Sequence, residues 1–200
     1  TVKMDSCSFI TFRNMTIKAL NTDYARVVEF VGGASNNIIS NNVIESTSTE
    51  SALIYSGGDQ DNNIKINNNL ISGGKIGIQM FGESALLLES GIEISGNIFE
   101  DQFSGAVSLM HTDASVVTDN LVTHPELIGG QWTGIYMDEC SGNVSAYGLI
   151  ANNSIAFNAE TMSAGIVLVA SSYQKIYHNS INIFGSTDNS RAFNQQEGGS

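Results

Sequence analysis

Ile39-Ser-Asn-Asn42-Val-Ile44 is one copy of a six-residue phrase that recurs along the whole chain. Further copies read Ile66-Asn-Asn-Asn69-Leu-Ile71, Ile94-Ser-Gly-Asn97-Ile-Phe99, Val117-Thr-Asp-Asn120-Leu-Val122 and Ile150-Ala-Asn-Asn153-Ser-Ile155. The asparagines that mark the repeat are Asn14, Asn42, Asn69, Asn97, Asn120, Asn153 and Asn179, with gaps of 28, 27, 28, 23, 33 and 26 residues. Self-similarity at a period in the twenties predicts a solenoid rather than a mixed globular fold.

Short strands are expected around each asparagine. Apolar and polar residues alternate in Ile64-Lys-Ile66 and Ile92-Glu-Ile94, which places the aliphatic side chains on one face. A second signal, a glycine followed by alternating apolar residues, comes later in the repeat, as in Gly77-Ile-Gln-Met-Phe81 and Gly134-Ile-Tyr-Met137. Two or three strands per repeat with turns between them predict an all-β fold, a right-handed single-stranded parallel β-helix of about seven coils.

The repeated asparagines have a structural explanation in this fold. Residues one coil apart lie directly above one another, so equivalent asparagines stack into a ladder. Each side-chain amide both donates and accepts hydrogen bonds, and can therefore bond to the coils on either side. We expect all seven asparagines, from Asn14 to Asn179, to take part. Cys7 and Cys140 then lie several coils apart, too far for a disulfide, which predicts two free thiols.

The charge of the chain argues against several classes of partner. The net charge is −12, and no lysine or arginine occurs between Ile76 and Gln174. Nucleic-acid binding draws most of its affinity from lysine and arginine on phosphates, so we expect no nucleic-acid partner. No apolar stretch approaches the length of a transmembrane helix, so we expect no insertion into a membrane.

The whole chain, residues 1–200, reads as one parallel β-helix domain. Neither terminus shows a capping helix, although the ends of a solenoid need cover against edge-to-edge association. We therefore expect a fragment of a longer solenoid, with the flanking coils of a parent chain as partners.

Departures from the mean period mark insertions, and insertions in solenoids often carry binding sites. The longest gap lies between Asn120 and Asn153 and holds Trp132, the only tryptophan of the chain. A tryptophan beside acidic groups could form a stacking platform for a sugar. The alternative is that Trp132 folds back over the edge of a coil and buries itself.

The strands supply further candidate ligand-binding residues. Alternation places Gln79, Phe81 and Tyr136 on an outward face, as a stripe of aromatic and amide side chains. Such a stripe can bind neutral glycans by stacking and hydrogen bonding. Aromatic residues on an exposed sheet also shield it, and the pattern does not separate these two roles.

Carboxylates are the candidate catalytic residues. Polysaccharide hydrolases place an acid and a base on one outward face, and Asp113, Asp138 and Glu139 are the candidates here. We expect Asp113 and Asp138 to follow equivalent strands of adjacent coils. The short motifs of β-helix polygalacturonases are missing, and a lyase would lack a basic residue in the central coils. The sequence therefore favours a protein without catalysis, and a hydrolase over a lyase if there is activity.

The sequence predicts no metal centre. No spacing of cysteine and histidine suggests zinc. The segments Asp59-Gln-Asp61 and Asp138-Glu139 offer oxygen ligands of the kind that calcium takes, but they lack the spacing of a calcium loop. We expect no cofactor, with calcium as the one ion left open.

Several phrases of the chain resemble one group of known proteins. These phrases are Asn36-Asn-Ile-Ile-Ser-Asn-Asn42, Gly134-Ile-Tyr-Met137, Ala151-Asn-Asn-Ser-Ile-Ala156 and Ser171-Ser-Tyr-Gln-Lys-Ile-Tyr-His-Asn-Ser-Ile181. They resemble right-handed parallel β-helix repeat proteins of Bacteroidetes, large secreted chains that often carry a type IX secretion sorting domain. The resemblance covers the chain from about Ser8 to Phe193 and implies an extracellular or cell-surface location. Some members are adhesin-like and some are attached to carbohydrate-active modules.

Three functions follow from these patterns. The first is a secreted or cell-surface scaffold, adhesin-like, that contacts a neutral glycan or another cell-surface component without catalysis. The second is a polysaccharide-acting enzyme, a glycoside hydrolase or lyase, with carboxylates on an outward sheet face. The third is a segment of a phage tailspike, which shares the fold.

Overall fold

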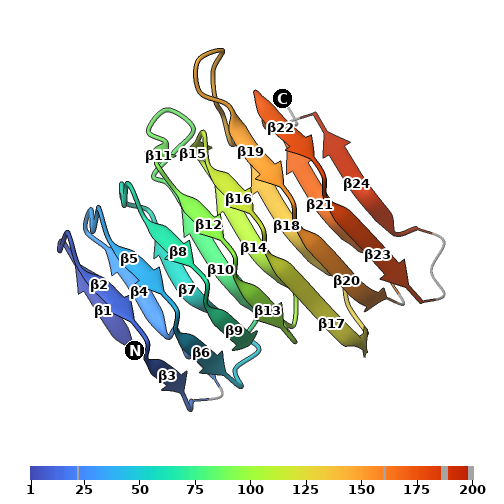
Figure 1. The fold of residues 1–200 in the computed structure, drawn as a ribbon, viewed down its shortest axis with the longest axis horizontal. Helices are drawn as coiled ribbons and strands as arrows, with labels where there is room; N and C mark the ends of the chain where they lie inside the picture. The colour runs from blue at the N-terminus through green and yellow to red at the C-terminus, as the bar shows by residue number, and fades with distance from the viewer. Residues whose placement is uncertain (22, 160, 186–188, 198–200) are drawn as a thin grey trace.

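The computed structural model describes residues 1–21, 23–159, 161–185 and 189–197. Across these ranges the regular structure consists of strands, and none of it is helical. Parallel strands stack coil upon coil into a solenoid of three main sheets, and the chain advances steadily from one end to the other (Figure 1). The all-β solenoid of about seven coils predicted from the repeat is confirmed.

Each coil contributes one strand to each main sheet. Sheet 1 contains β1 (Val2–Asp5), β4 (Val28–Val31), β7 (Ala52–Gly57), β10 (Ile76–Phe81), β14 (Gly105–Met110), β18 (Thr133–Asp138), β21 (Ala164–Val169) and β24 (Arg191–Gln196). Sheet 2 contains β2 (Thr11–Arg13), β5 (Ile38–Ser40), β8 (Lys65–Asn67), β12 (Glu93–Ser95), β16 (Val116–Thr118), β19 (Gly148–Ala151) and β22 (Gln174–Tyr177). Sheet 3 contains β3 (Thr16–Ala19), β6 (Val43–Ser46), β9 (Leu70–Gly73), β13 (Ile98–Glu100), β17 (Leu121–Ile128), β20 (Ser154–Ala159) and β23 (Ser180–Phe184). A fourth, two-stranded sheet pairs β11 (Glu89–Ser90) with β15 (Thr112–Asp113).

The core forms because equivalent aliphatic residues stack in register. Ile66 pairs with Ile39 on one side and with Ile94 on the other, and all three side chains are fully buried. The same holds for Ile71, which pairs with Ile44 and Phe99 in sheet 3. Because strands in a sheet lie about 4.8 Å apart, each coil covers the aliphatic layer of the last and one continuous core results.

The asparagine ladder runs through the turn between sheets 2 and 3. The Oδ1 of Asn120 accepts from the backbone N–H of Asn97 at 2.9 Å and from its Nδ2 at 3.1 Å. The Nδ2 of Asn97 also donates to the carbonyl of Ile66, so both amide protons are used. The same pattern links Asn42 to Asn69, Asn69 to Asn97, Asn120 to Asn153, and Asn153 to Asn179.

Asn14 does not occupy the ladder position, which corrects the prediction for the first coil. The backbone N–H that donates to Oδ1 of Asn42 belongs to Met15, and Asn14 lies one residue earlier. Asn14 has a φ of 57° and matches Asn41 and Asp119, which lie just before ladder asparagines and have φ values of 54° and 57°. The left-handed bend and the buried amide therefore fall on neighbouring residues. Asparagine or aspartate can occupy the bend position because both tolerate a positive φ.

The extra residues in the longest gap between ladder asparagines lie outside the ladder. Strand β17 extends to eight residues, and its register with β20 shifts between His124 and Leu127. A tight turn follows in the next coil, where Asn143 and Ala146 exchange backbone hydrogen bonds. The core coil continues on both sides of these additions.

A buried polar cluster lies inside the coils near β7. The hydroxyl of Ser56 lies 2.7 Å from Oδ2 of Asp61 and 2.9 Å from Oε1 of Glu89, and all three residues are 0% exposed. The other carboxylate oxygen of Glu89 has no hydrogen-bond partner among the described residues. Burial raises the pKa of Asp61 and raises that of Glu89 to about 7, because charged carboxylates are poorly solvated there.

Two further predictions bear on the fold. Cys7 and Cys140 are both free thiols, as their separation along the solenoid predicted. Within the described ranges, no helix is long and apolar enough to cross a membrane.

Candidate functional site

Rows of equivalent residues run along sheet 1, with one residue from each strand in register. The middle row contains Tyr55, Gln79, Ser108, Tyr136, Val167 and Asn194. The first row contains Ala52, Ile76, Gly105, Thr133, Ala164 and Arg191. The third row contains Gly57, Phe81, Met110, Asp138, Val169 and Gln196.

Three depressions lie mainly over the first and middle rows, and the third depression also reaches Gln196 of the third row. One of about 310 Å³ lies over β7 and β10, a second of about 180 Å³ over β10, β14 and β18, and a third of about 190 Å³ over β18, β21 and β24. Ile76 lines both the first and the second depression, and Thr133 and Tyr136 line both the second and the third. The depressions therefore adjoin one another in a row along the solenoid, and this row is called the groove below. From β7 to β24 it spans five strand spacings, about 24 Å.

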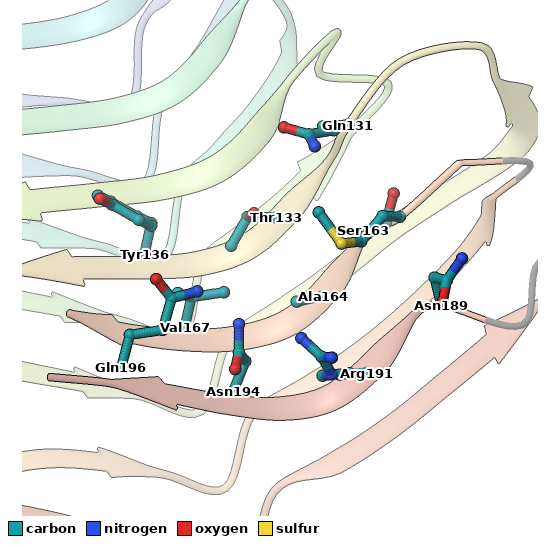
Figure 2. Close-up of a pocket in the computed structure, with 11 residues that line it drawn as sticks. Gln131, Thr133, Tyr136, Ser163, Ala164, Val167, Asn189, Arg191, Asn194 and Gln196 are labelled. Atoms are coloured by element: carbon teal, nitrogen blue, oxygen red, sulfur yellow. The ribbon is translucent and has the colours of Figure 1, made fainter.

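The third depression contains more amide side chains than the other two parts of the groove. Figure 2 shows its side chains, which come from β18, β21, β24 and the segments that lead into them, gathered around a common space. Amides, hydroxyls and one guanidinium surround an apolar floor, and the polar members include Gln131, Thr133, Ser163, Arg191, Asn194 and Gln196. Such a set offers donors and acceptors in nearly equal measure.

Charge is confined to the two ends of the groove. Arg26, Glu50 and Lys75 line the first depression, and Arg191 lines the third. The middle depression is lined by uncharged residues. At the first end, Arg26 pairs with Glu29 and its guanidinium lies 3.4 Å from the ring centre of Tyr55, which fixes that tyrosine at the mouth of the groove.

Tyr136 lies where the second and third depressions join. Its hydroxyl donates to Oδ2 of Asp138, two residues further along β18, at 3.0 Å. Burial, followed by the hydrogen bond and the charge of Asp138, raises the pKa of Tyr136 to about 12. The hydroxyl therefore keeps its proton at neutral pH, and the contact holds the ring in one position beside the groove.

Trp132 lies in the core, which excludes its expected role as an exposed sugar platform. Its side chain is 1% exposed, its ring centre lies 4.6 Å from that of Phe157, and its Nε1 donates to the carbonyl of Gln102 at 2.9 Å. The alternative, a tryptophan that buries itself, is the one that the structure adopts. Trp132 thus supports β18 from below and does not line the groove.

The carboxylates do not assemble as the sequence suggested. Asp138 pairs in register with Met110 of the preceding coil, whereas Asp113 pairs with Ser141 beyond the turn. Asp113 and Asp138 therefore lie in different rows on either side of a turn. Glu139 lies at that turn and contacts Nε2 of His111 through its Oε2 at 2.7 Å. The expectation that Asp113 and Asp138 follow equivalent strand positions is thus wrong.

Two of the three outward residues predicted by alternation line the groove, and their role in ligand binding stays a prediction. Gln79 and Tyr136 share the middle row and line the groove, whereas Phe81 lies in the third row, outside it. Arg191 and Asn194 were missed because the last strand was not recognised from its sequence. The signal was present, since Arg191-Ala-Phe-Asn-Gln-Gln196 follows the ladder asparagine Asn179 at the distance expected for another strand of sheet 1.

Comparisons with known proteins show what this chain is similar to. A search of curated proteins found no match. Among solved structures, the chain is similar to the Streptococcus pneumoniae surface protein and adhesin PfbA, with 12% sequence identity and a TM-score of 0.38. The alignment covers 92% of this chain and 63% of the PfbA chain, so the chain spans less than two thirds of that protein.

A family model gives a firmer assignment. The model described as periplasmic copper-binding protein (NosD) matches residues 81–198, more than half of the 200 residues. The matched part includes β14 to β24 and therefore the middle and the β24 end of the groove. On this match the chain belongs to the NosD family.

Proposed function

We propose that this chain is a rigid β-helix scaffold of an exported protein, and that its groove binds a neutral glycan without catalysis. The observation that carries the proposal is the row of three adjoining depressions, which share lining residues along six adjacent strands. A linear polymer is the kind of ligand that fits a long, shallow site. The parallel sheet beneath the groove is held by in-register pairing on both sides, so the site is formed before the ligand arrives.

The side chains along the groove suit sugar hydroxyls. The middle row offers the amides of Gln79 and Asn194, the hydroxyl of Ser108 and the rings of Tyr55 and Tyr136. Amides donate and accept at once, as sugar hydroxyls do. Tyrosine rings combine apolar faces with a polar tip, which suits the mixed surface of a sugar ring.

The charges support a neutral ligand over a polyanionic one. The middle of the groove has no charged lining residue, and the net charge of the chain is −12. A chain of uronic acids would therefore find no basic partner in the middle of the groove, and the net charge of the protein would oppose its binding.

The absence of catalysis is part of the proposal. Asp138, beside Tyr136, is engaged by the hydroxyl of that tyrosine, and Glu139 contacts His111. Asp113 lies beyond the turn, in another row. A hydrolase needs an acid and a base that flank one glycosidic bond, and this arrangement does not favour such a pair.

Export of the protein follows from the family. Its description names a periplasmic protein, which supports a place in the periplasm or at the cell surface. The extracellular or cell-surface location suggested by the sequence remains part of the proposal, as do the link to Bacteroidetes and the type IX route. A glycan of the cell envelope would be within reach in either compartment.

The sequence predicted no cofactor and left only calcium open. The family description corrects this expectation, because it names copper. Copper takes imidazole, thiolate or thioether ligands. His111 is already paired with Glu139, and Cys140 is buried with its thiol beside Thr112. Within the described ranges no group of three or more His, Cys, Asp and Glu residues could hold a metal ion. These residues do not fit a copper centre, and no step of the proposal depends on one.

The proposal is tested by binding and turnover together. Cellohexaose, xylohexaose, mannohexaose and oligogalacturonate would be titrated into the protein by calorimetry, and release of reducing ends would be followed on the matching polysaccharides. We expect a neutral oligosaccharide to bind and no reducing ends to appear. Turnover that is lost on Asp138→Asn would contradict the non-catalytic assignment, and preferential binding of oligogalacturonate would contradict the neutral ligand.

A further inference from the structure

We infer that the end of the groove over β24 is a subsite for one carboxylate-bearing sugar, such as a uronic or sialic acid, at the end of an otherwise neutral glycan. The inference rests on the proposed function, because it names the ligand of one part of the same groove. It concerns the third depression, which contains Arg191.

Arg191 is the residue that would bind the carboxylate. It begins β24, pairs in register with Ala164 and lines the third depression with an exposed side chain. The ion pairs between described residues involve other side chains and leave the guanidinium of Arg191 unengaged. A guanidinium offers two parallel N–H donors that match the two oxygens of a carboxylate.

Neighbouring side chains would hold the rest of that sugar. Asn194 lies three residues along β24 and lines the same depression as Arg191 (Figure 2). Thr133 and Ser163 bring hydroxyls from the preceding coils. Ala164 forms part of the apolar floor, on which the less polar face of a sugar ring can lie.

Charge limits this subsite to a single carboxylate. Asp138 lies in the third row beside Tyr136, next to the middle of the groove, and would repel further anionic sugars there. The middle depression has no cation among its lining residues. One carboxylate at Arg191 therefore gains an ion pair, while a second one in the middle of the groove gains no cation and is repelled by Asp138.

The test compares matched ligands. Mannohexaose and cellohexaose would be titrated beside the same oligosaccharides with the primary alcohol of the non-reducing terminal sugar oxidised to a carboxylate, and beside the methyl esters of these acids. A sialylated oligosaccharide would be the second acidic probe. We expect at least one acidic form to bind about tenfold more tightly than its neutral parent, because hydrogen bonds to charged groups are worth about that factor. The methyl ester should bind like the parent, and added salt should reduce the gain.

Variants separate Arg191 from the general charge of the protein. Arg191→Gln should remove the acidic preference, so that the acid and its neutral parent bind equally tightly to the variant, while Arg191→Lys should keep only part of the preference. Lys175→Gln is the matched control, since it removes the same charge from β22 in sheet 2 and should leave the preference intact.

The outcomes distinguish this inference from the proposed function. Neutral oligosaccharides that bind with no gain from any carboxylate would overturn the subsite and leave the proposed function in place. An acidic preference that persists in Arg191→Gln would overturn the role of Arg191. If neither neutral nor acidic oligosaccharides bind, the proposed function fails and the subsite fails with it.

Discussion

Asn97 and Asn120 are bonded through two contacts to a single oxygen, the Oδ1 of Asn120, although only 23 residues separate them. The next pair, Asn120 and Asn153, makes the same two contacts across 33 residues. The length of the coil between ladder positions can thus vary while the ladder geometry stays constant. Insertions and deletions fall on turns and strand ends, and the buried amides keep the coils in register.

The ladder predicts a large loss of stability when one amide is removed. Asn120→Ala would leave the N–H of Asn97 and the carbonyl of Ile94 without their buried partners. We expect a loss of about 2 to 4 kcal/mol in the free energy of unfolding, since buried unsatisfied groups carry their full desolvation cost. Urea denaturation followed by circular dichroism measures it.

Asn14→Asp is the control for this prediction. Asn14 is exposed, lies one residue before the ladder position and has a φ of 57°, which aspartate tolerates as well as asparagine. We expect a change within about 0.5 kcal/mol. A loss equal to that of Asn120→Ala would show that the first coil is anchored by Asn14 after all.

The buried carboxyl group of Glu89 leads us to expect that the free energy of unfolding falls as the pH rises. Its pKa is raised from an ordinary 4.5 to about 7 by burial, so the folded state holds a proton that the unfolded state releases. The stabilising contribution of that proton is complete below the ordinary carboxyl value and is lost as the pH rises through about 7. The pKa of Asp61 is raised as well, by burial, and acts in the same direction.

Thermal unfolding between about pH 5 and pH 8 checks this prediction. The melting temperature of the native chain should fall across that range, and Glu89→Gln should flatten the fall and melt higher at the alkaline end. Glu83→Gln, an exposed change in the segment that leads to Glu89, should leave the slope unaltered. A slope that survives in Glu89→Gln would place the responsible group elsewhere.

The position of Trp132 predicts both its fluorescence and its contribution to stability. It is the only tryptophan and is 1% exposed, so its emission should be blue-shifted and resist quenching by aqueous iodide. Trp132→Ala should cost about 3 to 5 kcal/mol of stability, the usual cost of removing a large buried ring. Iodide quenching in the native state, or quenching by a bound glycan, would mean that the indole lies at the surface.

The repeat in the sequence was sufficient to predict the coils, because stacking requires equivalent residues at equivalent positions. In the first coil the repeat predicted the ladder position one residue too early, and the reason is local. Most later repeats carry two adjacent polar residues, such as Asn41 and Asn42, whereas the first reads Asn14-Met15. At the first coil only the backbone N–H of the ladder position is used, so methionine can replace the amide there.

The site was harder to predict, because it depends on the register across a turn. Gln79 and Tyr136 were placed correctly by alternation within their own strands. Asp113 was misplaced because the coil turns after Met110, so that Asp113 falls in the short strand β15 instead of sheet 1. The burial of Trp132 depends on Phe157, which is distant in sequence, and no local pattern reports such a contact.

Blocking the groove at its centre tests the central claim most directly. Ser108 lies in the middle row between Gln79 and Tyr136 and lines the uncharged depression, whereas Met110 lies in the third row of the same strand, outside the groove. Calorimetry with the neutral oligosaccharide that binds best should show binding abolished by Ser108→Trp and retained by Met110→Trp, with both variants folded. Equal binding by both variants, or loss with Met110→Trp alone, would contradict the assignment of this groove as the glycan site.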